Sequence, residues 1–100
     1  MTQGEKEILN KLISYINSHG GVYSEWYSGI TSDPQQRLFV EHNVSRENGH
    51  WVYHNAGRDH SARNIVSALI NNYGTDGGSG WGNASTTTVY AYRKTAGTNP

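Results

Sequence analysis

The chain has 100 residues, 34% of them hydrophobic and 16% charged, and its eight basic residues balance eight acidic ones. This size accommodates one domain with one core, and the neutral balance argues against a general nucleic-acid binder while leaving room for a local basic patch. The absence of cysteine excludes disulfides and cysteine-based zinc sites, and the lack of a long apolar run argues against a signal or membrane segment, so a cytoplasmic location is expected.

The N-terminal third of the chain predicts a helix followed by a strand. Residues 5–17 place apolar side chains at helical spacing, with charged side chains on the opposite face, and a glycine pair follows as a stop. Residues 22–30 are rich in β-branched and aromatic side chains, which is typical of a strand. A single strand here would place Tyr23, Glu25 and Tyr27 on the same face.

The middle of the chain predicts a short helix and a second strand. Pro34 suits the first position of a helix that is capped by the residues before it and ends at His42 or Asn43. A turn follows, and residues 50–56 then have the pattern of a strand, with two aromatic side chains on one face and two histidines on the other.

The last third predicts a helix, a glycine-rich loop and a strand. The helix carries an apolar stripe that includes Val66, and it ends at Gly74. Residues 74–82 lack the lysine and the serine or threonine of a phosphate-binding loop. We therefore expect a turn on which Trp81 packs, or a contact surface, and not a nucleotide site. Residues 86–94 predict the last strand.

These elements follow the order αβαβαβ within one domain over residues 1–94, and residues 95–100 are expected to form a polar, frayed tail. Three strands with interleaved helices predict an α+β fold with a single three-stranded sheet flanked by three helices. The connections alone fit both parallel and antiparallel pairing of the strands.

A stretch that begins at Tyr27 resembles part of a known enzyme motif. Tyr-Ser-Gly-Ile-Thr at residues 27–31, followed by Arg37 and His42 on the predicted helix, resembles the second half of the GIY-YIG nuclease motif. The strand and helix that come next continue this likeness, which covers about residues 23–73. The resemblance implies a GIY-YIG-like, mostly antiparallel sheet.

The resemblance also implies catalytic roles for three of these side chains. In GIY-YIG nucleases a tyrosine or histidine takes a proton from water and an arginine steadies the phosphate, which implies these tasks for Tyr27, His42 and Arg37. Each side chain also has a simpler explanation. Tyr27 fits a half-buried strand position, Arg37 a solvated helix position, and His42 a favourable contact with a helix C-terminus.

The first strand of the family motif has its candidate at the other end of this chain. The family pairs its Gly-Ile-Tyr and Tyr-Ile-Gly strands as a hairpin, whereas Tyr23 and Tyr27 are only four residues apart and belong to one predicted strand. We infer a circular permutation in which the C-terminal strand takes the place of the first strand, and Tyr90 or Tyr92 stands in for its tyrosine.

Position 66 departs from the family pattern. The resemblance implies a glutamate one turn after Ala62 that binds a divalent ion, and Val66 stands there instead. A valine cannot coordinate Mg²⁺ or Mn²⁺, which need carboxylate ligands. We therefore expect no metal or other cofactor and a degenerate nuclease site. If the resemblance holds, Val66→Glu would place a carboxylate next to Tyr27 and Arg37.

Three functions stay open at this point. The first is a GIY-YIG-fold protein without cleavage activity that binds nucleic acid or a nucleic-acid-processing protein. The second is an active endonuclease that depends on Mg²⁺ or Mn²⁺ and uses another carboxylate, with Asp59, Glu41 and Glu25 the nearest candidates by sequence. The third is a small inhibitor or adaptor, such as a phage counter-defence protein. A neutral charge and exposed aromatic side chains suit such a protein, because aromatic residues dominate the binding energy of protein interfaces.

Overall fold

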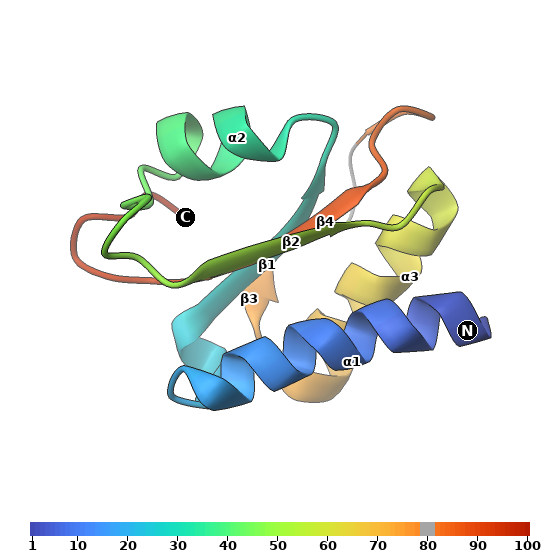
Figure 1. The fold of residues 1–100 in the computed structure, drawn as a ribbon, viewed down its shortest axis with the longest axis horizontal. Helices are drawn as coiled ribbons and strands as arrows, with labels where there is room; N and C mark the ends of the chain where they lie inside the picture. Colours follow the sequence, from blue (N-terminus) through green and yellow to red (C-terminus); the bar gives the residue numbers. More distant parts are fainter. Residues whose placement is uncertain (79–81) are drawn as a thin grey trace.

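The computed structural model describes residues 1–78 and 82–100, and the predicted packing of Trp81 lies outside these described residues. In chain order the elements are α1 (Gln3–Ser18), η1 (Tyr23–Glu25), β1 (Trp26–Thr31), α2 (Pro34–Gln36), η2 (Arg37–Glu41), β2 (Trp51–Asn55), α3 (Asp59–Ala68), η3 (Leu69–Tyr73), β3 (Asp76–Gly77) and β4 (Thr88–Arg93). Figure 1 shows that they form an α+β fold, as predicted. Among the helices of the two described ranges, none combines the length and the apolarity needed to cross a lipid bilayer.

The sheet has four strands in the order β2-β4-β1-β3 (Figure 1). β4 pairs antiparallel with both β1 and β2, so the C-terminal strand is the antiparallel neighbour of β1, where we expected it. The prediction of three strands is corrected by β3, which runs parallel to β1 over only two residues. Gly77 in β3 passes so close to Ser28 that a Cβ atom would overlap the Ser28 carbonyl oxygen. The glycine at position 77 therefore permits the close pairing of β3 with β1, which the composition of residues 74–82 did not predict.

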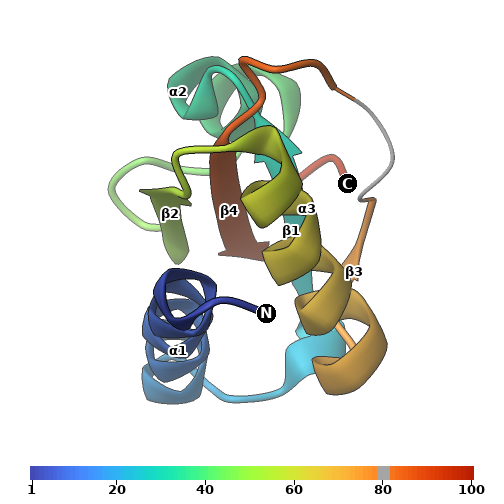
Figure 2. The same cartoon turned by 90° about the vertical axis from the view of Figure 1, so that its right-hand side faces the viewer.

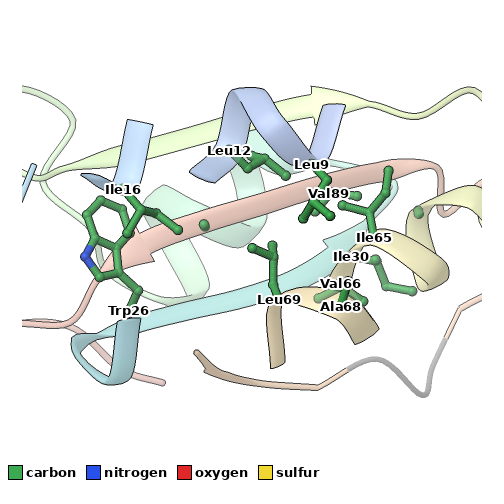
Figure 3. Packing of buried hydrophobic residues seen from close by; sticks show 12 residues of the cluster. Leu9, Leu12, Ile16, Trp26, Ile30, Ile65, Val66, Ala68, Leu69 and Val89 are labelled. Carbon is green, nitrogen blue, oxygen red and sulfur yellow. The ribbon is translucent and has the colours of Figure 1, made fainter. Parts of the chain in front are cut away.

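Different helices cover the two faces of the sheet (Figures 1 and 2). α1 and α3 pack against one face, and α2 with η2 lies over the other. Because successive side chains of a strand alternate between faces, β1 and β4 each supply residues to two cores. The main core lies on the side of α1 and α3 (Figure 3) and contains Leu9, Leu12, Ile16, Trp26, Ile30, Ala62, Ile65, Val66, Ala68, Leu69, Val89 and Ala91. The smaller core lies on the side of η2 and contains Leu38, Val44, Tyr90 and Tyr92.

The first helix confirms its prediction and begins slightly earlier than expected. Thr2 and Glu5 form a reciprocal cap, in which Thr2 Oγ1 accepts the N–H of Glu5 at 3.1 Å and Glu5 Oε1 accepts the N–H of Thr2 at 3.0 Å. This cap satisfies two backbone donors that the first turn of a helix leaves unpaired. The apolar stripe then buries Leu12 and Ile16 completely in the main core.

The predicted strand over residues 22–30 is shorter than expected. η1 makes a single 3-10 turn before β1 begins at Trp26, which is fully buried in the main core. The Tyr23 ring packs against the same core, and its hydroxyl donates to Asn17 in α1. The prediction that Tyr23 shares a strand face with Tyr27 is therefore wrong, because Tyr27 packs against the smaller core on the opposite face.

Residues 95–100 fold back toward α2 and η2 (Figure 1), where the sequence predicted a frayed tail. The main-chain N–H of Asn99 donates to the carbonyl oxygen of His42 at 2.8 Å, and Asn43 Nδ2 donates to the carbonyl oxygen of Gly97 at 3.0 Å. The tail is therefore attached to the segment that follows η2.

Candidate functional site

The candidate residues meet on the sheet face that α2 and η2 cover. Tyr27 in β1 and Tyr90 and Tyr92 in β4 belong to this face, Arg37 begins η2, and His42 follows it. The centroid of the His42 ring lies 4.8 Å from those of Tyr27 and Tyr92 and 5.4 Å from that of Tyr90. The structure thus brings together the four predicted residues, Tyr27, Arg37, His42 and Tyr90, together with Tyr92, which the sequence offered as the alternative to Tyr90. We call these five residues the tyrosine–histidine cluster.

Tyr90 reaches the cluster by crossing the neighbouring strand at Gly29. The pairing of β1 with β4 sets Gly29 opposite Tyr90 and Tyr27 opposite Tyr92. A Cβ atom on Gly29 would lie 2.5 Å from the Tyr90 hydroxyl oxygen and 2.7 Å from its Cζ atom. The glycine of the Tyr-Ser-Gly stretch therefore provides the space in which the Tyr90 side chain lies, and both β4 tyrosines take part in the cluster.

His42 is held by hydrogen bonds at both ring nitrogens. Its Nδ1 lies 2.6 Å from the carbonyl oxygen of Asn99, and its Nε2 lies 2.7 Å from the Tyr90 hydroxyl. A carbonyl oxygen can only accept, so Nδ1 carries the proton and the neutral ring accepts the Tyr90 O–H at Nε2. The Tyr92 oxygen lies 3.0 Å from Nδ1 and shares the same proton, and its own hydroxyl donates to Asn99 at 3.5 Å.

Burial keeps the rings of the cluster uncharged. Burial is the main cause that lowers the pKa of His42. The hydrogen bond to the Asn99 carbonyl acts in the opposite direction and raises this pKa, whereas the charge of Arg37 lowers it further. Burial is also the main cause that raises the pKa of the Tyr27, Tyr90 and Tyr92 hydroxyls. All four rings are therefore neutral near pH 7, and the guanidinium of Arg37 supplies the positive charge of the cluster.

Two members of the cluster are accessible from solvent, and three are not. His42 and the two β4 tyrosines are at most 6% exposed, whereas the Arg37 side chain is 38% exposed and Tyr27 is half-buried. Nε of Arg37 lies 3.1 Å from Glu41 Oε1 without the alignment of a hydrogen bond. This Nε atom is buried and its N–H has no acceptor in the part of the chain that the structure describes, so the exposed fraction of Arg37 comes from the rest of its side chain. A ligand would therefore meet Arg37 and Tyr27 first, with the other rings as support.

A π turn brings Arg37 and His42 together. Their helix starts at Pro34, as predicted, with the Asp33 carboxylate as its cap. It then widens into η2, where the N–H of His42 donates to the carbonyl oxygen of Arg37 at 2.9 Å. Because a π turn spans one residue more than an α turn, it directs residues five apart to the same side of the helix. The sequence predicts the helix, but not the π turn that unites these two side chains.

Val66 lies away from the cluster. It is fully buried in the main core, on the opposite face of the sheet, beside Ile30 and Leu69 (Figure 3). A carboxylate at this position would enter an apolar core shared by α1 and α3. The expectation that position 66 adjoins Tyr27 and Arg37 is therefore wrong.

The three alternative carboxylates also lie in different places. Glu41 is beside the cluster arginine, whereas Asp59 pairs with Arg63 in α3 at 2.8 Å and Glu25 pairs with Arg93 at 2.9 Å. Within residues 1–78 and 82–100, no group of three or more histidine, aspartate or glutamate side chains could hold a metal ion. Glu41 is therefore the one predicted carboxylate that a ligand at the cluster would meet.

Two contributions to the site were not predicted. The carbonyl oxygen of Asn99 contacts His42, and Asp76 lies opposite Tyr27 across β3 and β1, where its charge adds to burial in raising the pKa of Tyr27. A main-chain contact leaves no signal in residue type, and β3 is too short to show a pattern. Asn43 is the one residue type that could have indicated the tail contact. Its φ of 55° is a left-handed conformation that asparagine adopts more readily than most residues, and its side-chain amide holds Gly97 of the tail.

Comparisons of the chain with protein-family models, with curated proteins and with solved structures found no match. The likeness to GIY-YIG nucleases therefore stays a prediction, and so does the circular permutation. What the cluster can do follows from its own geometry: a partly exposed arginine side chain paired with Glu41, a half-buried phenol beside it, and a neutral hydrogen-bonded network behind them.

Proposed function

We propose that this protein binds nucleic acid through its phosphates at the tyrosine–histidine cluster and does not cleave it. The observation that supports this most directly is Arg37. Its side chain is 38% exposed beside the cluster tyrosines, whereas its Nε atom is buried and has no hydrogen-bond acceptor among the described residues. A guanidinium presents planar paired donors that match two phosphate oxygens, and such charge-assisted bonds are among the stronger ones in proteins.

Aromatic side chains beside the cluster favour nucleic acid over a free phosphate. Phe39, Trp51 and Tyr53 pack against the smaller core and remain half-buried on the same sheet face. Trp51 and Tyr53 stack at 6.0 Å with ring planes 13° apart, and the Arg46 guanidinium lies 3.8 Å from the centroid of Phe39. Bases stack on such surfaces with little sequence preference, which suits a single-stranded ligand.

The proposed lack of cleavage follows from the groups around Arg37. Two carboxylates flank the cluster, but each already pairs with a cation: Glu41 with Arg37 at 3.1 Å, and Asp76 with Lys94 at 3.3 Å. A hard divalent ion would have to compete with these ion pairs for its carboxylate ligands. The raised pKa of Tyr90 keeps its proton in place at neutral pH, so it is a poor base toward water. Phosphate recognition is the task that the remaining groups can perform.

An active endonuclease is the second candidate, and Glu41 favours it. Its carboxylate is 50% exposed and lies near the arginine that would hold the scissile phosphate, so it could share a metal ion with substrate oxygens. The first candidate accounts for the same contact as an ion pair within one helical segment. Metal-dependent cleavage distinguishes the two.

The test is a comparison of two arginines that are matched in exposure and pairing. Arg37 and Arg63 are 38% and 34% exposed, and each pairs with an acidic residue four positions away, but on opposite faces of the sheet. We expect Arg37→Gln to weaken binding of labelled single-stranded DNA and RNA in fluorescence anisotropy by roughly tenfold or more, because a hydrogen bond to a charged group contributes about 1.5–3 kcal/mol. Arg63→Gln should leave the affinity unchanged.

Three results would contradict the proposed function. If Arg37→Gln and Arg63→Gln weaken nucleic-acid binding equally, the cluster is not the binding site. Cleavage in Mg²⁺ or Mn²⁺ that Glu41→Gln abolishes would establish the endonuclease. Absence of binding to any nucleic acid, together with recovery of one stoichiometric protein partner at high salt, would indicate an inhibitor or adaptor instead.

A further inference from the structure

The C-terminal tail, residues 95–100, lies against the tyrosine–histidine cluster but buries little of itself. All of its residues are exposed or half-exposed. Its attachment depends on main-chain and amide hydrogen bonds: Asn99 N–H to the carbonyl oxygen of His42 at 2.8 Å, and Asn43 Nδ2 to the carbonyl oxygen of Gly97 at 3.0 Å. The tail is therefore held by polar contacts and not by the core.

The same segment provides the hydrogen-bond acceptor for a buried histidine. The carbonyl oxygen of Asn99 lies 2.6 Å from Nδ1 of His42 and 3.5 Å from the Tyr92 hydroxyl. On the other side of the ring, Nε2 lies 2.7 Å from the Tyr90 hydroxyl, which can either donate or accept. Because the carbonyl has no proton to give, it alone decides which nitrogen carries the proton.

We propose that the C-terminal tail is the positioning element of His42, with the Asn99 carbonyl fixing the proton on Nδ1 and thereby directing the Tyr90 proton onto Nε2. The hydrogen bonds then run in one direction, from Tyr90 through His42 to Asn99. A chain of hydrogen bonds with a common direction strengthens each of its members. Asn99 acts through His42, so it is a positioning residue.

This arrangement also fixes how Tyr90 faces Arg37. With its proton given to His42, the Tyr90 oxygen keeps lone pairs that can accept from a nearby donor, and the guanidinium of Arg37, whose charge acts on Tyr90, has only protons to offer. If the tail leaves, His42 can hold its proton on Nε2, and Tyr90 must then direct a proton toward Arg37. The two donors would oppose each other, and we expect the guanidinium of Arg37 to turn away from Tyr90. This consequence for binding rests on the proposed function, whereas the protonation of His42 does not.

The protonation is measured directly by long-range ¹H–¹⁵N correlation spectra of the full, labelled chain at neutral pH without nucleic acid. We expect His42 to show a protonated Nδ1 and an unprotonated Nε2, and His42→Gln identifies its signals. Asn99→Pro removes the N–H that holds the tail, and we expect this pattern to be lost. Asn99→Ala keeps the main-chain bonds, and its side chain makes no hydrogen bond among the described residues, so the pattern should persist.

A second variant covers the case in which Asn99→Pro fails to fold. Asn43→Gly retains the left-handed backbone, because glycine tolerates a positive φ, and removes the amide that holds Gly97. Loss of the Nδ1-protonated pattern in this variant supports the inference, and its retention in every folded tail variant overturns it. Anisotropy then separates the two proposals: we expect Asn99→Pro to bind nucleic acid several-fold more weakly. Failure of the wild-type chain as well as all variants to bind nucleic acid would count against the proposed function alone.

Discussion

Gly29 is the residue on which the cluster depends most directly at the scale of single side chains. The Tyr90 ring crosses β1 at this position, and the contact of its hydroxyl with His42 requires that nothing stand there. The glycine has an ordinary strand backbone, so its role is to provide space and not an unusual conformation. A side chain at this position would therefore act on the cluster through Tyr90.

We expect Gly29→Ala to lower the free energy of unfolding by about 1–3 kcal/mol, because overpacking forces a buried ring from its position. Urea unfolding measures this loss, and the NMR signals of His42 should change with it. Gly4→Ala is the control: its Cβ atom would come no closer than 4.0 Å to Thr2 Oγ1, and alanine suits a helix better than glycine. A folded Gly29→Ala protein as stable as the wild type would show that Tyr90 does not need this space.

The sequence indicated the side chains of the cluster but not the main-chain group that holds His42. The motif resemblance selected Tyr27, Arg37 and His42, and the inferred circular permutation added Tyr90, with Tyr92 as its alternative; the structure places both tyrosines together. Their chemical roles remain predictions. Asn99 could not be selected, because it acts through its main chain and any residue other than proline would offer the same groups.

At the scale of elements, regular periodicity was a reliable guide and short irregular segments were not. α1, α3, β2 and β4 lie where the patterns of apolar residues place them. The prediction of one strand over residues 22–30 was wrong at η1. The composition of these residues suits a strand, but Trp26 and Tyr23 pack against the same core, and this requires a turn before β1. β3 is two residues long and depends on pairing with β1, which no local pattern can reveal.

The π turn η2 gives a test at this scale. Val40 is 63% exposed, and its deletion would reduce the spacing between Arg37 and His42 from five positions to four, which an α turn accommodates. We expect the deletion variant to fold with a loss of at most about 1 kcal/mol and to keep the protonated Nδ1 of His42, as measured by urea unfolding and NMR.

Deletion of Leu38 is the matched control. This neighbour in η2 is fully buried in the smaller core, so its removal should cost roughly 2–5 kcal/mol. If removal of Val40 is as damaging as removal of Leu38, the π turn does more than accommodate one additional residue.

At the scale of the whole molecule, the sheet separates two environments. The face covered by α1 and α3 holds the aliphatic core, and the face covered by α2 and η2 holds the tyrosine–histidine cluster and its aromatic neighbours. The order of elements along the chain predicts the helices, but not which face each one covers. Position 66 shows the consequence: the motif likeness set it beside the cluster, and the fold sets it on the far side of the sheet.

We expect Val66→Glu to destabilise the protein by roughly 3–5 kcal/mol without creating a metal site, because it buries a carboxyl group among aliphatic side chains. Urea unfolding and calorimetric titration with Mn²⁺ measure the two effects. Val40→Glu, at a 63% exposed position, should change the free energy of unfolding by no more than about 0.5 kcal/mol. Stoichiometric Mn²⁺ binding by the folded Val66→Glu variant would contradict this prediction and would support the resemblance of position 66 to the metal-binding position of the nucleases.

The contact of Asn99 with His42 has a practical consequence for handling the protein. A purification tag or fluorescent fusion joined after Pro100 would begin one residue from the carbonyl that holds the histidine, and it could pull that carbonyl away or crowd the ring. Met1 lies at the opposite end of the molecule (Figure 1), next to residues of α3. Appendages belong at that end if the assays above are to report on the undisturbed protein.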